Sequence, residues 1–193
     1  MQKPYSTACD RNALPILNAL QKIINYDQKQ QLLEVGSGTG QHAVSIAQYF
    51  PNLIWQTSDV ESNHDGIKLW IENSEASNII TPVAFELGKN SFPKGDFDIV
   101  YTANTFHIIS WEYCRLLITL CGKKLNNGAY IIIYGPFNYN NTYTSRSNEE
   151  FDQYLMARSP SRGIRNFEEV EEIMMGNKFS FLKGSIPYFD LGC

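Results

Sequence analysis

The chain has 193 residues, 43% of them hydrophobic and 19% charged, a globular composition that argues against a disordered protein. Its formal net charge is -4, and since Lys and Arg do not cluster, we expect no surface for nucleic acid or an anionic membrane. Four dispersed cysteines and three dispersed histidines predict neither a disulfide framework nor a metal site.

Helices and strands are expected to alternate along the chain. Apolar residues at helical spacing predict an amphipathic helix over 11–25, and a short apolar run predicts a buried strand over 32–35. Further helices are expected over 41–49, 64–74 and 111–125, and further strands over 53–57, 81–85, 97–101 and 129–134. The polar stretch 138–148 is rich in Asn, Ser and Thr, which is typical of a lid or of a disordered loop.

The expected strands are continuous apolar runs, not alternating ones. This pattern predicts a mostly parallel sheet covered on both faces, in a Rossmann-like three-layer α/β sandwich. We expect one domain over residues 1–193, with 1–25 as an N-terminal helical segment or lid. In such sheets ligands bind at the carboxyl ends of the strands, so the residues that follow each strand are the informative ones.

A glycine-rich segment follows the first expected strand. Glu34-Val35 ends the strand, and Gly36-Ser37-Gly38-Thr39-Gly40 precedes the helix expected from residue 41. The glycines permit a tight turn and a close approach of a ligand to the backbone. The spacing differs from the G-x-G-x-x-G of NAD enzymes, and no P-loop Lys-Ser/Thr follows. A plain strand-to-helix turn remains the alternative.

An acidic residue, Asp59, ends the second expected strand. It lies roughly 20 residues beyond the glycine loop, the spacing at which a carboxylate binds ribose hydroxyls. The alternative is that Ser58-Asp59 caps the next helix, and the two roles are compatible.

The pattern Glu34-x-Gly36-x-Gly38-x-Gly40, with Asp59 after the second strand, resembles the cofactor signature of class I methyltransferases that use S-adenosylmethionine (SAM). The resemblance implies SAM as cofactor and S-adenosylhomocysteine (SAH) as product. In that superfamily the glycine loop runs under the methionine part of SAM, the acidic residue holds the ribose, and a residue after the third strand lies near the adenine. The cofactor-binding residues implied here are Glu34, Gly36, Ser37, Gly38, Gly40, Asp59, Glu86 and Asn104. Arg11, on the N-terminal segment, could bind the cofactor carboxylate, and a surface helix start is the alternative.

A second resemblance is more specific. The chain is similar to a poorly characterised methyltransferase-like family over residues 5 to about 187. The matching motifs are Tyr5-Ser6, Asp10-Arg11-Asn12, Pro15-Ile16-Leu17, Ser37-Gly38-Thr39-Gly40-Gln41-His42-Ala43, Trp55-Gln56-x-Ser58-Asp59, Ala103-Asn104-x-x-His107-Ile108-x-x-Trp111-Glu112, Tyr134-Gly135-Pro136-Phe137 and Ser147-Asn148-x-x-Phe151-Asp152. The resemblance ends at 186–193, so we expect the final antiparallel strand to be missing or altered.

Residues after the fourth and fifth strands are candidates for chemistry, because in the superfamily the fourth strand faces the methyl group of SAM. His107 is the candidate general base, since the ordinary pKa of histidine permits proton uptake near neutral pH; a packed histidine is the alternative. Asn104 could orient a substrate amide or hydroxyl, or be a turn residue. The substrate-contacting candidates are Tyr5, Asn12, Trp111, Tyr134 and Phe137. Core packing is the alternative for Phe137, and a surface helix start is the alternative for Tyr5 and Asn12.

We interpret the chain as a SAM-dependent methyltransferase acting on a small-molecule acceptor. A non-catalytic SAM- or nucleoside-binding module, or a partner subunit with a degenerate fold, is the alternative. Since the N-terminus lacks the apolar segment of a signal peptide and the aliphatic runs are too short for a bilayer, a cytoplasmic location is expected. We expect no nucleic-acid, membrane or metal partner, and we leave a homodimer open.

Overall fold

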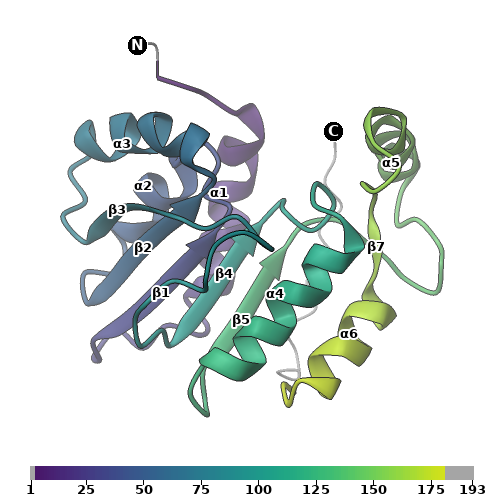
Figure 1. Cartoon of the computed structure of the whole chain (residues 1–193). Coiled ribbons are helices and arrows are strands. Elements are labelled where there is room, and N and C mark those ends of the chain that lie inside the picture. The colour runs from purple at the N-terminus through teal and green to yellow at the C-terminus, as the bar shows by residue number, and fades with distance from the viewer. Residues whose placement is uncertain (1–2, 181–193) are drawn as a thin grey trace. The chain divides into compact units, whose positions relative to one another are not determined.

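A computed structural model describes residues 3–180 (Figure 1). Its chain forms two compact units. Unit 1 comprises the residues up to Thr102 together with Leu125–Ile132, and unit 2 comprises Ala103–Lys124 and the residues from Ile133 onward. The single-domain expectation remains a prediction, and each unit is described by itself below.

Strands and helices alternate through the first two thirds of the chain, as expected. The strands are β1 (Gln30–Val35), β2 (Leu53–Asp59), β3 (Ile79–Ala84), β4 (Ile99–Ala103), β5 (Tyr130–Tyr134), β6 (Phe137–Asn138) and β7 (Arg165–Asn166). The helices are α1 (Thr7–Leu20), α2 (Gln41–Ala47), η1 (Glu61–Asn63), α3 (His64–Glu72), α4 (Trp111–Lys124), α5 (Arg146–Arg158) and α6 (Phe167–Gly176).

The main sheet has five strands in the order β3-β2-β1-β4-β5. β1 pairs in parallel with both β2 and β4, and β2 pairs in parallel with β3. The predicted fold class, an α/β fold built on a mostly parallel sheet, is therefore confirmed. The strand order reverses between β1 and β4, and this switch point is where ligands bind in open α/β sheets.

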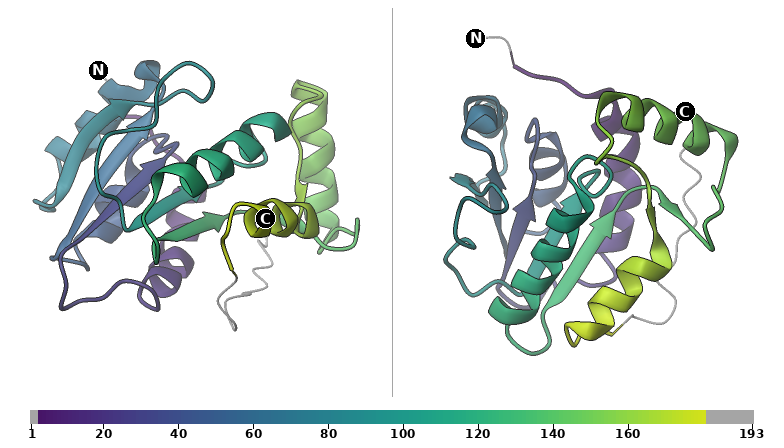
Figure 2. Two further views of the ribbon diagram at one scale, coloured as in Figure 1. Left: turned by 60° about the horizontal axis from the view of Figure 1, so that its bottom comes forward. Right: turned by 45° about the vertical axis from the view of Figure 1, so that its right-hand side comes forward.

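Three helices of unit 1 form one layer. α2 contacts α1 and α3, α2 also contacts β2 and β3, and α3 contacts β3; Figures 1 and 2 show these helices side by side. The core beneath them centres on Trp55 and Tyr101, both fully buried, whose rings meet edge to face with centroids 5.6 Å apart. Large aromatic side chains at this point bury more apolar area than any other residue type.

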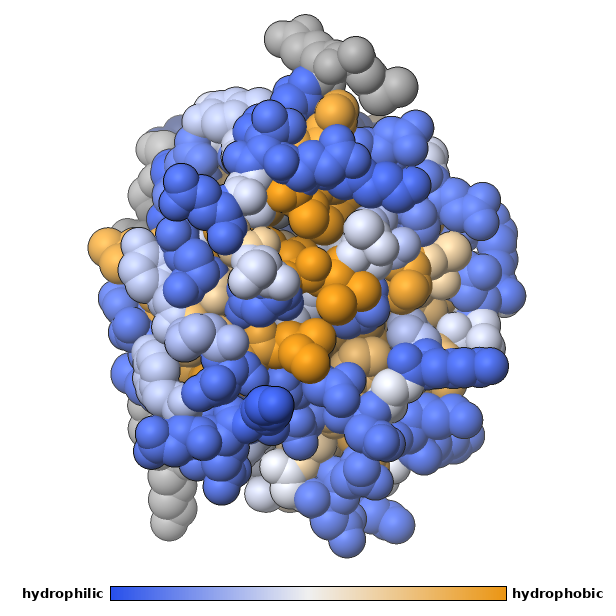
Figure 3. Space-filling model, turned by 90° about the vertical axis from the view of Figure 1, so that its left-hand side faces the viewer, coloured by the Kyte–Doolittle hydropathy of each residue, from blue (hydrophilic) through white to orange (hydrophobic). Residues whose placement is uncertain are grey.

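The outer strands of unit 1 also carry exposed apolar side chains. Ile54 of β2 is 42% exposed and Ile80 of β3 is 44% exposed. The segment between β3 and β4 forms turns and no helix. Figure 3, which views the side where β3 lies, shows apolar side chains gathered in the middle of that face and ringed by hydrophilic ones.

Several boundaries differ from the sequence-based prediction. The first helix was expected over 11–25 but spans Thr7–Leu20; Ile24 is buried just after the turn that follows the helix, so its apolar character reflects packing and not helical periodicity. The polar stretch 138–148 includes the start of α5, whose N-cap residue Ser145 accepts a bond from the Asn148 N–H at 3.2 Å. A capping side chain of this kind starts a helix even where the sequence is polar.

Two further expectations concern the chain as a whole. The change expected in the last antiparallel strand falls on 186–193 and lies outside the described residues. Over residues 3–180, no helix combines the length and the apolar character that a membrane span requires.

Candidate functional site

The glycine loop of unit 1 joins β1 to α2 through residues with left-handed backbone. Gly36, Gly38 and Gly40 have φ angles of 75°, 59° and 89°, a region that L-residues with a Cβ rarely adopt. A Cβ on Gly40 would lie 3.1 Å from the Cα of Ile67 on α3, whereas a Cβ on Gly38 would meet nothing within 4 Å. Gly40 therefore permits close packing with a helix, and Gly38 leaves open space beside the loop.

A buried network fixes the start of the loop. The Ser37 hydroxyl donates to Oε2 of Glu34 at 2.9 Å and accepts from the Ser58 N–H at 3.1 Å. The backbone N–H groups of Gly36 and Ser37 both donate to the Ser58 carbonyl at 3.0 Å. The network links the ends of β1 and β2, so the loop conformation depends on both strands.

Glu34 is a carboxyl group inside this network. It is 1% exposed, and the indole N–H of Trp55 also donates to its Oε2, at 3.0 Å. Burial raises the pKa of Glu34 from 4.5 to about 7, while the bonds from Trp55 and Ser37 oppose the rise. The hydrogen bonds that Glu34 accepts from Ser37 and Trp55 hold the start of the glycine loop in place.

Asp59 is bound to the loop from the end of β2. Its Oδ2 accepts the Gly38 N–H at 2.6 Å, and its Oδ1 accepts the Val60 N–H at 2.7 Å and the Asn63 amide at 2.9 Å. A carboxylate has about four lone-pair sites, so Oδ2 retains the capacity to accept a ligand hydroxyl. Gly38, whose N–H bonds this carboxylate, has open space on its Cβ side, and these residues fit a nucleoside cofactor with a polar chain.

The other predicted residues of unit 1 have contacts of their own. Arg11 is exposed and its guanidinium donates to Thr7 at 3.5 Å. Tyr5 is 62% exposed and its hydroxyl donates to Asp10, whereas Asn12 is buried at 3% exposure. Glu86 follows β3 and forms an ion pair with Lys89 at 2.5 Å. Their assignments to the cofactor and the acceptor remain predictions.

In unit 2, the segment after β4 brings together three of the predicted positions. Asn104 has a left-handed backbone, with φ 56°, and its N–H donates to the Tyr134 carbonyl at 2.8 Å. Gly135 lies against both Asn104 and His107, since a Cβ on it would stand 3.7 Å from His107 Nδ1 and 3.9 Å from Asn104. Asn104, His107 and Tyr134 therefore form one cluster, and burial raises the pKa of the Tyr134 hydroxyl.

The segment that carries His107 is held by residues 163–165, which lead into β7 and include its first residue. Arg165 donates to the carbonyls of Phe106 at 3.0 Å and Ile109 at 2.6 Å. The Gly163 N–H donates to the His107 carbonyl at 3.1 Å. Three of four successive carbonyls are thus satisfied from one stretch, so the His107 backbone is held in place.

The His107 side chain is buried, at 5% exposure, with its ring edge to face against Phe151 at a centroid distance of 5.2 Å. Burial lowers its pKa to about 4; the Arg165 guanidinium adds to this and Asp152 opposes it. The imidazole is therefore neutral at pH 7, with a lone pair available to accept a proton or a hydrogen bond.

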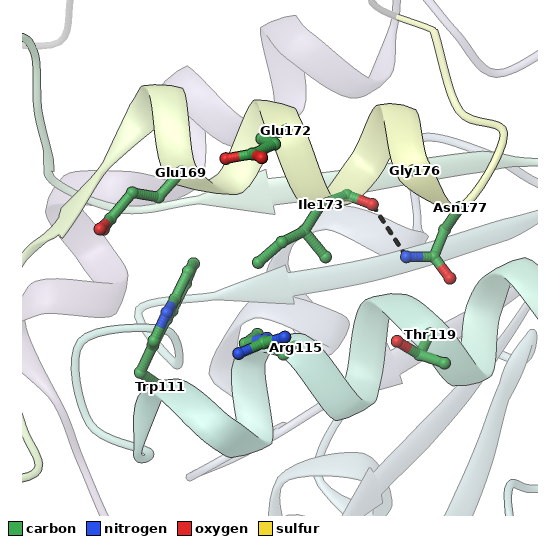
Figure 4. A pocket seen from close by; sticks show the side chains of 8 residues that line it. All are labelled: Trp111, Arg115, Thr119, Glu169, Glu172, Ile173, Gly176 and Asn177. Carbon is green, nitrogen blue, oxygen red and sulfur yellow. Dashed lines mark hydrogen bonds between the residues drawn. The ribbon is translucent and has the colours of Figure 1, made fainter.

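Two predicted acceptor contacts lie elsewhere in unit 2. Phe137 packs edge to face on Phe167, at a centroid distance of 6.4 Å. Trp111 lines a groove of about 430 Å³ between α4 and α6, together with Arg115, Glu169 and other side chains (Figure 4). The remaining groove residues are not among those predicted from sequence.

Several residues that shape these sites were not predicted. Gln41 bonds the N-terminal segment to the glycine loop, although only its place after the loop pointed to it. Arg165 is half-buried and bound to backbone carbonyls, contacts that its sequence neighbourhood does not indicate. Over residues 3–180, no cluster of three or more His, Cys, Asp or Glu could hold a metal ion.

Comparison with protein families identifies the chain. A family described as proteins of unknown function, DUF938, matches residues 3–182. The chain belongs to the DUF938 family. The expected membership of a poorly characterised family is thereby confirmed, and the match includes the glycine loop, Asp59 and the His107 segment of this DUF938 chain.

Solved structures match the DUF938 fold at low sequence identity. An O-methyltransferase family protein from Burkholderia thailandensis has a TM-score of 0.75 at 15% identity, covering 91% of this chain and 53% of that one. Human N-acetylserotonin methyltransferase in complex with SAM has a TM-score of 0.71 at 14% identity, covering 88% and 46%. An O-methyltransferase family 2 protein from Planctomyces limnophilus in complex with apigenin has a TM-score of 0.76 at 14% identity, covering 91% and 55%.

The chain spans about half the length of these structures. At such identities the likeness concerns the fold, which is that of class I SAM-dependent methyltransferases. The fold predicted from the glycine loop and the strand pattern is confirmed.

Proposed function

We propose that this DUF938 chain binds SAM and transfers its methyl group to a small-molecule acceptor. The observation that carries the proposal is the bond between the Gly38 N–H and Asp59 Oδ2, 2.6 Å long. It joins the glycine loop to a carboxylate that retains acceptor capacity, beside open space. This is the arrangement that a nucleoside with a polar amino-acid chain requires.

The proposed roles follow from the chemistry of each group. Asp59 accepts the ribose hydroxyls, and the glycine loop receives the methionine part. SAM supplies a methyl group already activated by its sulfonium, so the task of the chain is to align the acceptor with that group. The fold neighbours that contain SAM or apigenin support both a SAM site and a small-molecule acceptor.

We assign His107 as the proton acceptor and Asn104 as the residue that orients the acceptor. A neutral imidazole can take the proton that the acceptor loses. Because burial holds the pKa of His107 at about 4, it is a weak base, and the best acceptors are those with an acidic hydroxyl. The carbonyl bonds from Arg165 and Gly163 give the base a defined position.

Isothermal titration calorimetry with SAM, SAH and NAD tests the cofactor. The wild type should bind SAM and SAH. Asp59→Asn should lower the affinity for both roughly 10- to 100-fold, which is the free-energy contribution of a hydrogen bond to a charged group expressed as a change in Kd. Asp65→Asn is the matched control, since Asp65 is 71% exposed and paired only loosely with Lys68, at 3.9 Å. It should bind both ligands as the wild type does.

A thermal-unfolding series gives an independent readout. A ligand at about 100 times its dissociation constant should add about 2.7 kcal/mol of stability. No stabilisation by SAM or SAH, or stabilisation by NAD alone, would overturn the proposal. Binding of SAM without formation of SAH, across phenols, carboxylic acids and amines as acceptors, would instead favour a non-catalytic SAM-binding module.

A further inference from the structure

The N-terminal segment lies against α3 before it enters α1. The indole N–H of Trp70 donates to the Pro4 carbonyl at 2.6 Å, and the Lys3 ammonium lies 3.5 Å from the Trp70 ring centroid. Gly66 permits this contact, because a Cβ there would lie 2.6 Å from Pro4 Cγ. The segment therefore follows a defined path over unit 1.

One side chain joins this segment to the glycine loop. The Gln41 carbonyl oxygen accepts from the Ser6 N–H at 2.5 Å and from the Thr39 hydroxyl at 3.0 Å. Its amide N–H₂ donates to the Ser6 carbonyl at 3.2 Å and to Asp10 Oδ1 at 3.3 Å. Gln41 thus bonds both backbone groups of Ser6, as a neighbouring strand would.

The surroundings make this contact selective for an amide. Gln41 is 3% exposed, so a change that leaves its partners unsatisfied carries the cost of burying them unpaired. Asp10 also accepts the Tyr5 hydroxyl, and its carboxylate can only accept. The partner of Asp10 at residue 41 must therefore be a donor, which glutamine supplies and glutamate does not.

We propose that Gln41 is a positioning residue of the cofactor site, which sets the affinity for SAM by fastening the segment Ser6–Asp10 to the glycine loop. The inference rests on the proposed function, since it presumes that the loop binds SAM. Gln41 acts on the loop through Thr39, which lies between Gly38 and Gly40.

The proposal predicts which part of the ligand is affected. The glycine loop receives the methionine part, whereas Asp59 accepts the ribose. Loss of the Gln41 contacts should therefore lower the affinity for ligands that carry the amino-acid chain and leave the affinity for ligands without it unchanged. SAH has that chain, and 5′-methylthioadenosine does not.

The experiment is calorimetry of SAH and 5′-methylthioadenosine on matched variants. Gln41→Glu keeps the acceptor oxygen but replaces the donor that faces Asp10. The substitution should lower the affinity for SAH roughly 10-fold, which corresponds to the loss of about one or two net hydrogen bonds. It should change the affinity for 5′-methylthioadenosine less than 2-fold. Adding Asp10→Asn to Gln41→Glu restores a donor to the pair and should recover most of the SAH affinity. Gln48→Glu is the control, because exposed Gln48 lies just after the same helix and donates to Ser45.

If the wild type binds SAH and Gln41→Glu binds it with the same affinity, the inference is overturned and the proposed function stands. Equal loss of both ligands together with a lowered unfolding midpoint would also overturn it, because the role would then be structural only. If the wild type binds neither ligand, the proposed function itself fails and the inference with it.

Discussion

Glu34 offers a direct test of how the buried network works. The carboxyl is 1% exposed, and burial raises its pKa from 4.5 to about 7. At 1.36 kcal/mol per pKa unit, the two protonation states differ by about 3 kcal/mol in their contribution to stability. Because the pKa is higher in the folded chain, this contribution is full below pH 4.5 and is lost as the pH rises through about 7.

Glu34→Gln removes the titrating group and keeps an oxygen that can accept from Ser37 and Trp55. The free energy of unfolding of the variant minus that of the wild type should therefore increase by about 3 kcal/mol as the pH rises from 4.5 to 8. Urea unfolding of both proteins at half-unit pH steps measures the difference. Glu72→Gln, at an exposed position on α3, is the control variant.

Other buried groups do not obscure the result. Burial lowers the pKa of His42 and His107 to about 4, so their contributions are present above pH 6.5 and are lost as the pH falls through about 4. Both histidines are common to the two proteins, and their effects cancel in the difference. A difference between Glu34→Gln and the wild type that is constant from pH 4.5 to pH 8 would refute the reasoning.

Three further outcomes are expected. Gly40→Ala should lower the free energy of unfolding by about 1–3 kcal/mol, because the new Cβ is strained at a φ of 89° and also lies 3.1 Å from the Cα of Ile67. Gly38→Ala introduces backbone strain alone and should lower the free energy of unfolding by about 1 kcal/mol in the same urea assay. Arg165→Ala should cost about 1.5–3 kcal/mol, since it leaves backbone carbonyls without their donor, as chemical unfolding will measure. By NMR, the His107 ring should titrate near pH 4 and not near 6.5, because it is buried.

Each outcome has a result that contradicts it. Equal costs at the two glycines would show that the contact with Ile67 is relieved by small shifts. Unchanged stability in Arg165→Ala would mean that water satisfies the carbonyls of Phe106 and Ile109 in the variant. A midpoint near 6.5 for His107 would mean that its ring is solvated, and it would then be a stronger base than proposed.

The secondary structure of the first two thirds of the chain could be predicted because its signals are local. Continuous apolar runs marked β1, β2, β4 and β5 to within two residues at each end, since a short apolar run bounded by turn residues indicates a buried strand. α5 and α6 were not predicted. α5 is a polar helix that starts at a capping serine, and a weak apolar periodicity gives little signal.

The sequence alone determined the fold class, the glycine loop and the acidic residue after β2, because each depends on residues close together in the chain. Only the tertiary structure decided what surrounds them. Gln41 meets Ser6 across 35 positions and Arg165 meets Phe106 across 59, and no periodicity encodes a hydrogen bond over such separations. The raised pKa of Glu34 likewise arises from burial by the assembled strands, a property that a carboxyl group acquires only when the chain folds.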